Sequence, residues 1–188
     1  MESRIPKSCT AFAGTVRIAT GSLADVALCA KRAIDTDRTL PVLVFDDETS
    51  EVVELDLRGT PDEVAARMPG PAARPRGRPR LGVVPREVTL LPRHWEWLRT
   101  QRGGASAALR RLVEQASRDC AGRDRVRRAQ EVAYRFMHAM AGDERDFEEA
   151  ARALFARDRE RFDRYRAGWP ADIADHASRL AAGAFGDD

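Results

Sequence analysis

The segment from Arg74 to Arg80, with the sequence RPRGRPR, constrains the fold of this chain more than any other stretch. Its two prolines each fix φ near about −65° and exclude a helix, and Gly77 removes side-chain bulk at the centre. Arginines alternate with these residues, so the segment is expected to be extended and unpacked when free. It therefore separates an N-terminal part of the chain from a C-terminal part.

Positive charge is concentrated in the same region. Residues 71–118 hold 11 Lys/Arg against 3 Asp/Glu, whereas residues 1–70 hold 8 against 12 and residues 119–188 hold 13 against 15. The net charge of +2 thus conceals a basic middle between acidic flanks. Such a patch is typical of a protein that binds a polyanion, whereas a merely solvated surface usually mixes signs. The charge pattern therefore predicts nucleic-acid binding.

An extended cationic strip fits the minor groove of A·T-rich DNA, where the negative potential attracts arginine and no guanine amino group intrudes. Residues 75–79 resemble the core of an AT-hook, a minor-groove DNA-binding arm. The resemblance implies that Arg76 and Arg78 lie along the groove floor and that Gly77 lets the backbone approach. Arg74 and Arg80 would then contact phosphates. The alternative is a Pro/Arg linker that contains the pattern by chance.

A strand followed by two helices is predicted directly after this arm. In residues 86–91, Val88 and Leu90 fall on one face and Glu87 and Thr89 on the other, which indicates a short strand with one apolar side. Pro92 then favours the start of a helix. Gly103 and Gly104 end that helix, and Ser106 is the predicted N-cap of a second one. The apolar face of the second helix comprises Leu109, Leu112, Val113 and Ala116.

A lone strand leaves backbone groups unpaired on both edges, so two chains would have to pair these strands and form a homodimer. Residues 84–118 resemble the ribbon-helix-helix family of bacterial DNA-binding proteins in this order of elements. The resemblance implies that Glu87 and Thr89 face the major groove. It also implies that the backbone amides of Gly104, Ala105 and Ser106 hold a phosphate. A dimerisation unit or core hairpin that binds no nucleic acid is the alternative.

The N-terminal part is predicted to be a small α+β domain over residues 1–70. Alternation predicts a hairpin over residues 10–20 with its turn near Gly14, and a second strand pair at residues 42–45 and 52–57. Ser22 and Thr60 are predicted N-caps of helices that run to about Asp35 and Met68. The resulting order is ββαββα. Residues 71–83 form the AT-hook-like basic linker, and residues 84–118 form the ribbon-helix-helix-like unit.

Residues 119–188 are predicted to be a helical C-terminal region. Apolar residues at helical spacing indicate one helix from about Asp124 to Gly142 and a second from Phe147, which either continues or breaks before Phe162. A last helix is indicated by Ile173, His176, Ala177 and Leu180. These helices are expected to pack on one another or across the dimer.

Catalysis is not expected from this sequence. Asp46 and Asp47 lie at a predicted hairpin turn, where Asp is placed for backbone reasons, so a hydrolase that uses this pair is a distant alternative. The three histidines are isolated, and the three cysteines show no CxxC spacing, so neither a metal nor a cofactor is expected. No run of 18 apolar residues occurs. We therefore expect a soluble cytoplasmic protein without a membrane contact.

Nearly the whole chain is similar to a bacterial family known only as domain of unknown function 2239. The residues that carry this resemblance are CTAF at 9–12, PVLVFDD at 41–47, and LLPRHWEWL at 90–98 through GGAS at 103–106. The family implies no activity, so the functional hypothesis rests on the central segment. That hypothesis is sequence- or A·T-preferring binding of double-stranded DNA, in transcription regulation or a nucleoid-type architectural role. The alternative is a protein-interaction adaptor with a basic docking segment.

Overall fold

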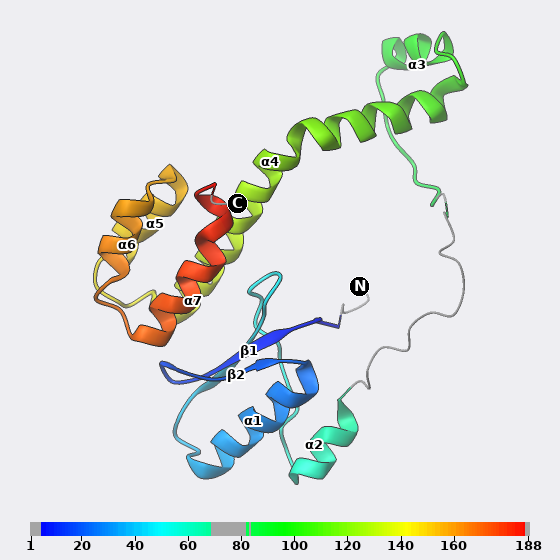
Figure 1. The fold of residues 1–188 in the computed structure, drawn as a ribbon. Helices are drawn as coiled ribbons and strands as arrows, with labels where there is room; N and C mark the ends of the chain where they lie inside the picture. Colours follow the sequence, from blue (N-terminus) through cyan, green and yellow to red (C-terminus); the bar gives the residue numbers. More distant parts are fainter. Residues whose placement is uncertain (1–4, 69–81, 83, 187–188) are drawn as a thin grey trace. The chain divides into compact units, whose positions relative to one another are not determined.

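The computed structural model describes residues 5–68, 82 and 84–186 of the chain (Figure 1). These residues form a three-stranded antiparallel sheet and seven α-helices, so the predicted α+β class is confirmed. The chain divides into two compact units. The first unit combines residues 1–72 with residues 125–188, and the second comprises residues 73–124. The first unit is therefore built from both ends of the chain.

The sheet has β1 (Cys9–Ala13) at its centre, with β2 (Val16–Gly21) on one side and β3 (Val42–Asp46) on the other. Both pairings are antiparallel. Gly14 adopts a φ of 57° in the turn between β1 and β2, a conformation that glycine reaches without strain. The predicted hairpin over residues 10–20 is thus confirmed.

Two helices of the N-terminal part begin at the predicted N-caps. Helix α1 (Leu23–Thr36) begins after Ser22, whose hydroxyl oxygen accepts a hydrogen bond from a backbone amide of the first turn. Helix α2 (Pro61–Arg67) begins after Thr60, which forms a reciprocal capping box with Glu63. Each cap satisfies amides that the first turn of a helix leaves without a partner.

The predicted strand over residues 52–57 does not form, so the observed order in the N-terminal part is ββαβα rather than ββαββα. The returning chain pairs with β3 only at its start, through one bridge between Phe45 and Val52 and a hydrogen bond from the Val53 amide to the Val44 carbonyl. Val53, Leu55 and Leu57 still pack against the core on the α1 side. The alternation of apolar and polar residues over 52–57 therefore predicted correctly which side chains are buried. It did not require these residues to pair with β3 as a strand.

The C-terminal part is helical as predicted, with one difference in its boundaries. Helix α4 (Gly104–Ala141) is a single 38-residue helix that joins the two helices expected on either side of residues 119–123. Gly122 is the weakest helix former between them, and its cost of about 1 kcal/mol relative to alanine does not break a long helix. The helices α5 (Phe147–Ala156), α6 (Arg159–Arg166) and α7 (Ala171–Ala181) follow, with a short 3₁₀ turn at Ala182–Ala184.

The first unit has three layers, with the sheet between α1 and the C-terminal helices (Figure 1). Every residue of β1 is buried, because alternate side chains enter two different cores. Cys9 and Ala11 pack with residues of α1, whereas Phe12 joins the core of the C-terminal helices. The Phe12 ring lies 5.4 Å from the Phe136 ring of α4. The sequence prediction followed chain order and did not bring the two ends of the chain together.

The second unit contains α3 (Pro92–Arg99) and the first half of α4, joined by a turn. Pro92 occupies the first turn of α3, as predicted. Gly103 and Gly104 have φ angles of 84° and 75°, which explains why the predicted turn carries two glycines. Helix α4 begins at Gly104, so Ser106 lies inside its first turn and is not the N-cap.

Candidate nucleic-acid interface

The DNA-contacting residues predicted from the sequence fall into three groups. The arm residues Arg74, Arg76, Gly77, Arg78 and Arg80 lie outside the described residues. The predicted major-groove residues Glu87 and Thr89 are exposed. The predicted phosphate-binding residues Gly104, Ala105 and Ser106 form the start of α4, where a helix leaves amides without intrahelical partners. The Gly104 amide already donates to the Gln101 carbonyl at 3.0 Å, which leaves the following amides for an anion.

The predicted strand over residues 86–91 is not formed in the described chain, where residues 84–91 carry no regular secondary structure. The apolar face expected for it is correspondingly uncovered. Val88 is 53% exposed, and Leu90 is half-buried. A strand forms only when its backbone groups have a partner, and the single chain supplies none within the described residues. Pairing of two such segments across a dimer remains a prediction.

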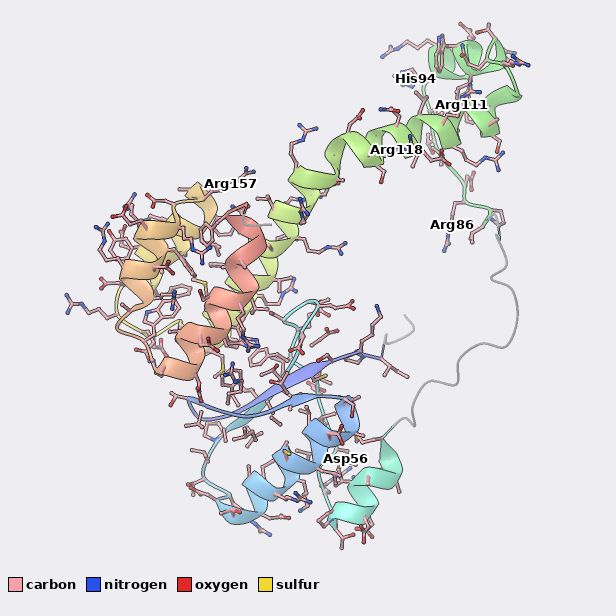
Figure 2. The ribbon with its side chains drawn as sticks, in the orientation of Figure 1. Asp56, Arg86, His94, Arg111, Arg118 and Arg157 are labelled. Carbon is pink, nitrogen blue, oxygen red and sulfur yellow. The ribbon has the colours of Figure 1, made fainter. Side chains whose placement is uncertain are left out.

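The arginines of the second unit are largely without acidic partners. Among the described residues 84–118 there are seven arginines and three glutamates. Only Arg118 forms an ion pair there, with Glu114 at 3.6 Å, and both side chains are more than 60% exposed. The other arginines, which form no ion pair with a described residue, are Arg86, Arg93, Arg99, Arg102, Arg110 and Arg111. The described residues of this segment therefore leave most of its positive charge without an acidic partner; Figure 2 labels Arg86, Arg111 and Arg118 among these arginines.

Apolar side chains of the second unit are also uncovered. Within the described residues 84–124, Leu98 and Ala108 are the only buried side chains. Large apolar side chains that remain 40–67% exposed come from the segment before α3, from α3 and from α4: Val84, Val88, Leu91, Trp95, Trp97, Leu112 and Val113. Exposed apolar surface of this extent is typical of interaction sites in proteins.

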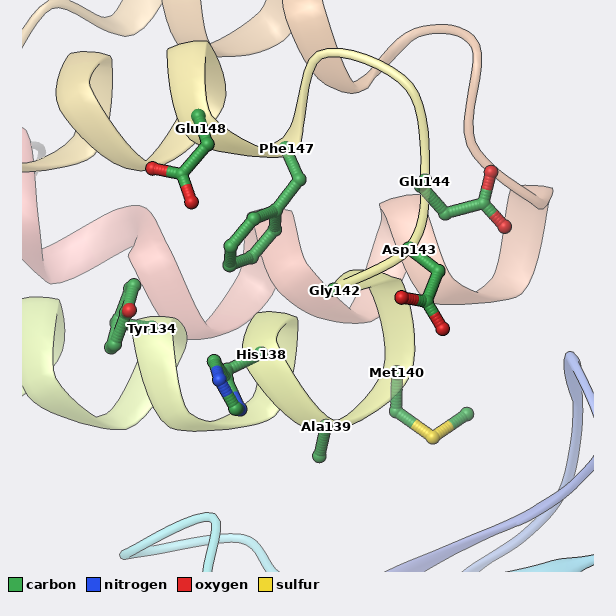
Figure 3. Close-up of a pocket in the computed structure, with 9 residues that line it drawn as sticks. All are labelled: Tyr134, His138, Ala139, Met140, Gly142, Asp143, Glu144, Phe147 and Glu148. Atoms are coloured by element: carbon green, nitrogen blue, oxygen red, sulfur yellow. The ribbon is translucent and has the colours of Figure 1, made fainter.

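A separate cavity of about 470 Å³ lies in the first unit, between the end of α4 and the start of α5 (Figure 3). Tyr134 and His138 of α4 face Phe147 and Glu148 of α5, and the three rings lie 6.0–6.2 Å apart. The carboxylates of Asp143, Glu144 and Glu148 also line the cavity and form no ion pair with a described residue. Its negative charge makes this cavity unsuited to a polyanion, and none of the predicted site residues lies in it.

The acidic turn after β3 is a structural feature rather than a solvated loop. Asp46 is only 5% exposed, and its carboxylate accepts a hydrogen bond from the Glu48 amide at 2.7 Å. Asp47 accepts hydrogen bonds from the Ser8 hydroxyl at 2.5 Å and from the Thr10 hydroxyl at 2.7 Å. These bonds tie the end of β3 to β1. Burial, together with the negative charges of Asp47 and Asp46, raises the pKa of the adjacent Cys9 thiol to about 11.

His176 of α7 is buried together with apolar residues with which helical spacing grouped it. It is 3% exposed, and its ring lies 4.5 Å from the Phe136 ring and 5.4 Å from the Phe12 ring. Its Nδ1 lies 2.6 Å from the Arg179 guanidinium, so Nδ1 accepts and the proton of the neutral ring resides on Nε2. Nε2 has no hydrogen-bond partner among the described residues. Burial and the nearby Arg179 lower the pKa of His176 from 6.5 to about 4.

Neither a metal site nor a membrane span is found in the part of the chain that the structure describes. No group of three His, Cys, Asp or Glu side chains there is arranged to hold a metal ion. None of the described helices combines the length and apolarity required to cross a bilayer.

The fold is that of an α+β protein in which the helices α3 and α4 follow one another in the middle of the sequence and carry an exposed basic surface. The chain belongs to the bacterial family described as "Uncharacterized protein conserved in bacteria (DUF2239)", whose model matches residues 8–181. The resemblance to this family that the sequence suggested is thus confirmed. No curated protein and no solved structure matches the chain.

Proposed function

We propose that this protein is a homodimer that binds double-stranded DNA, as a transcription regulator or a small architectural protein. The observation that carries this proposal is the set of arginines in residues 84–118 that lack acidic partners. Because phosphate groups are regularly spaced along DNA, an unneutralised basic surface gains affinity by releasing their counterions. In the sequence, the arm from Arg74 to Arg80 precedes this segment and supplies four further arginines.

A second copy of the chain is the partner that best fits the uncovered apolar side chains of the second unit. Pairing the segments at residues 86–91 would satisfy their backbone groups and cover Val88 at the same time. The same contact would cover the apolar side of α4, where Leu112 is 49% and Val113 65% exposed. A hydrophobic contact between like-charged copies is favourable only if their arginines face away from it, and the spacing of Arg111 and Arg118 along α4 meets that condition.

We assign the preference for A·T-rich DNA to the arm and not to the segment at residues 86–91. Glu87 would repel the DNA backbone, although its carboxylate can accept a hydrogen bond from cytosine N4. Thr89 can contact a thymine methyl group. Neither residue supplies a positive charge, so the strand segment would position the protein while Arg76 and Arg78 select narrow, A·T-rich minor grooves.

The proposal is tested by fluorescence anisotropy with labelled A·T-rich and G·C-rich duplexes at several salt concentrations. We expect binding that weakens steeply with salt, with tighter binding to the A·T-rich duplex. Replacing Arg76 and Arg78 with alanine should reduce the difference between the two duplexes, because the minor-groove contacts are lost. The absence of binding to either duplex at low salt would contradict the proposal. Unchanged A·T preference in the double variant would remove the arm from it.

A protein-interaction adaptor is the second candidate function. The observation that favours it is the exposure of Trp95 and Trp97, which are 40% and 51% exposed, because tryptophan is enriched in protein interfaces. Purification from cell lysate with and without nuclease separates the two candidates. Nucleic acid should co-purify only if the protein binds DNA, whereas an adaptor would retain the same protein partner after nuclease treatment.

A further inference from the structure

The first half of α4 carries two different faces. With 3.6 residues per turn, Leu109, Leu112, Val113 and Ala116 lie on one side of the helix. Arg111 and Arg118 lie on the opposite side and Arg110 lies on the flank next to Val113, and we call these three residues the arginine face. Every residue from Arg110 to Asp119 is exposed, so the arginine face is accessible in the second unit (Figure 2).

The arginine face keeps nearly all of its positive charge. Arg110 and Arg111 form no ion pair with a described residue, and the Arg111 guanidinium instead donates to the Arg102 carbonyl at 3.3 Å. Glu114 is the one carboxylate between these arginines on the helix. Its contact with Arg118 is exposed, and exposed pairs of this kind contribute little, so the arginine remains free to exchange partners.

We propose that the arginine face binds DNA phosphates, as a second contact that is separate from the arm. This inference rests on the proposed function. Guanidinium groups match the geometry of phosphate oxygens, and a helix sets the spacing between the residues that carry them. If a second copy covers the apolar side of α4, the arginine face remains uncovered and points away from that contact. The face therefore adds affinity that does not depend on the base sequence.

The test compares the salt dependence of duplex binding by the full chain and by Arg110→Gln/Arg111→Gln. The slope of log K against log salt should become less steep by about 0.9 for each phosphate contact removed. The loss should be equal for A·T-rich and G·C-rich duplexes. Arg32→Gln/Arg38→Gln is the matched control, because it removes the same charge from exposed positions of the first unit. Its slope should equal that of the wild type. Arg110→Lys/Arg111→Lys should restore most of the slope, since lysine keeps the charge.

A gain of affinity provides a test that misfolding cannot imitate. Glu114→Gln removes the one carboxylate among these arginines and should tighten binding to both duplexes. The inference is overturned if wild type binds DNA while the Arg110/Arg111 glutamine variant shows an unchanged slope, or if Glu114→Gln leaves affinity unchanged. If wild type binds neither duplex, the proposed function itself fails, so the two failures are distinguishable. Circular dichroism of each variant should match the wild type, because all three positions are exposed.

Discussion

At the scale of single residues, His176 couples the stability of the first unit to pH. The charged groups that act on it come from three elements: Arg179 and Asp175 from α7, Arg17 from β2, and Asp47 from the turn after β3. The unfolded chain takes up a proton at this histidine below pH 6.5, whereas the folded protein does so only below about pH 4. The unfolded state thus binds more protons between these values, and stability falls as the pH drops through this window.

We therefore expect the free energy of unfolding to fall by up to about 3 kcal/mol between pH 6.5 and pH 4 through His176 alone. Urea unfolding at a series of pH values measures this change. His176→Gln should be less stable at pH 7.5, because it loses aromatic packing, but its stability should depend less on pH in this window. Equal pH profiles for wild type and His176→Gln would refute the coupling.

At the scale of secondary-structure elements, the exposed apolar side of α4 is the surface through which we propose that two copies of the chain associate. Val113→Arg places a charge on that side and should convert the dimer to a monomer, because an arginine would be buried between two apolar surfaces. Sedimentation equilibrium measures the change, and DNA binding should weaken as the second binding unit is lost. Gln115→Arg adds the same charge on another side of the helix and should leave the dimer intact. A wild-type chain that sediments as a monomer would contradict the dimer.

At the scale of the whole molecule, the sheet depends on helices from the other end of the chain. Phe12 and Phe45 are fully buried against the C-terminal helices, and each loses about 1.5–3 kcal/mol of burial if those helices are absent. Residues 1–70 expressed alone should therefore unfold without a cooperative transition and bind a hydrophobic dye. Adding residues 119–188 should restore cooperative unfolding, as followed by circular dichroism. A cooperative transition in residues 1–70 alone would show that the two ends are independent.

The difference between contacts of neighbouring residues and contacts of distant residues explains how much could be predicted from the sequence. The caps at Ser22 and Thr60, the Gly14 hairpin and the glycine turn before α4 were predicted, because each depends on neighbouring residues. The strand at residues 52–57 was wrong, because alternation reports which side chains are buried and not whether the backbone stays beside its partner strand. The contact of Phe12 with Phe136 gave no local signal, whereas helical spacing grouped His176 with apolar residues of the last helix. For the candidate site, composition located the basic residues and helical spacing located the apolar side of α4, but the arginines on its other side were not recognised as a separate face.

The contribution of both chain ends to the first unit also affects its synthesis. When residues 9–46 leave the ribosome, the partners of Phe12 and Phe45 on α4 and α7 have not yet been translated. At bacterial elongation rates the sheet would wait on the order of ten seconds with two phenylalanines exposed to water. During that interval the nascent chain presents the apolar surface that chaperones recognise, so its yield in cells should depend on them more than its modest size suggests.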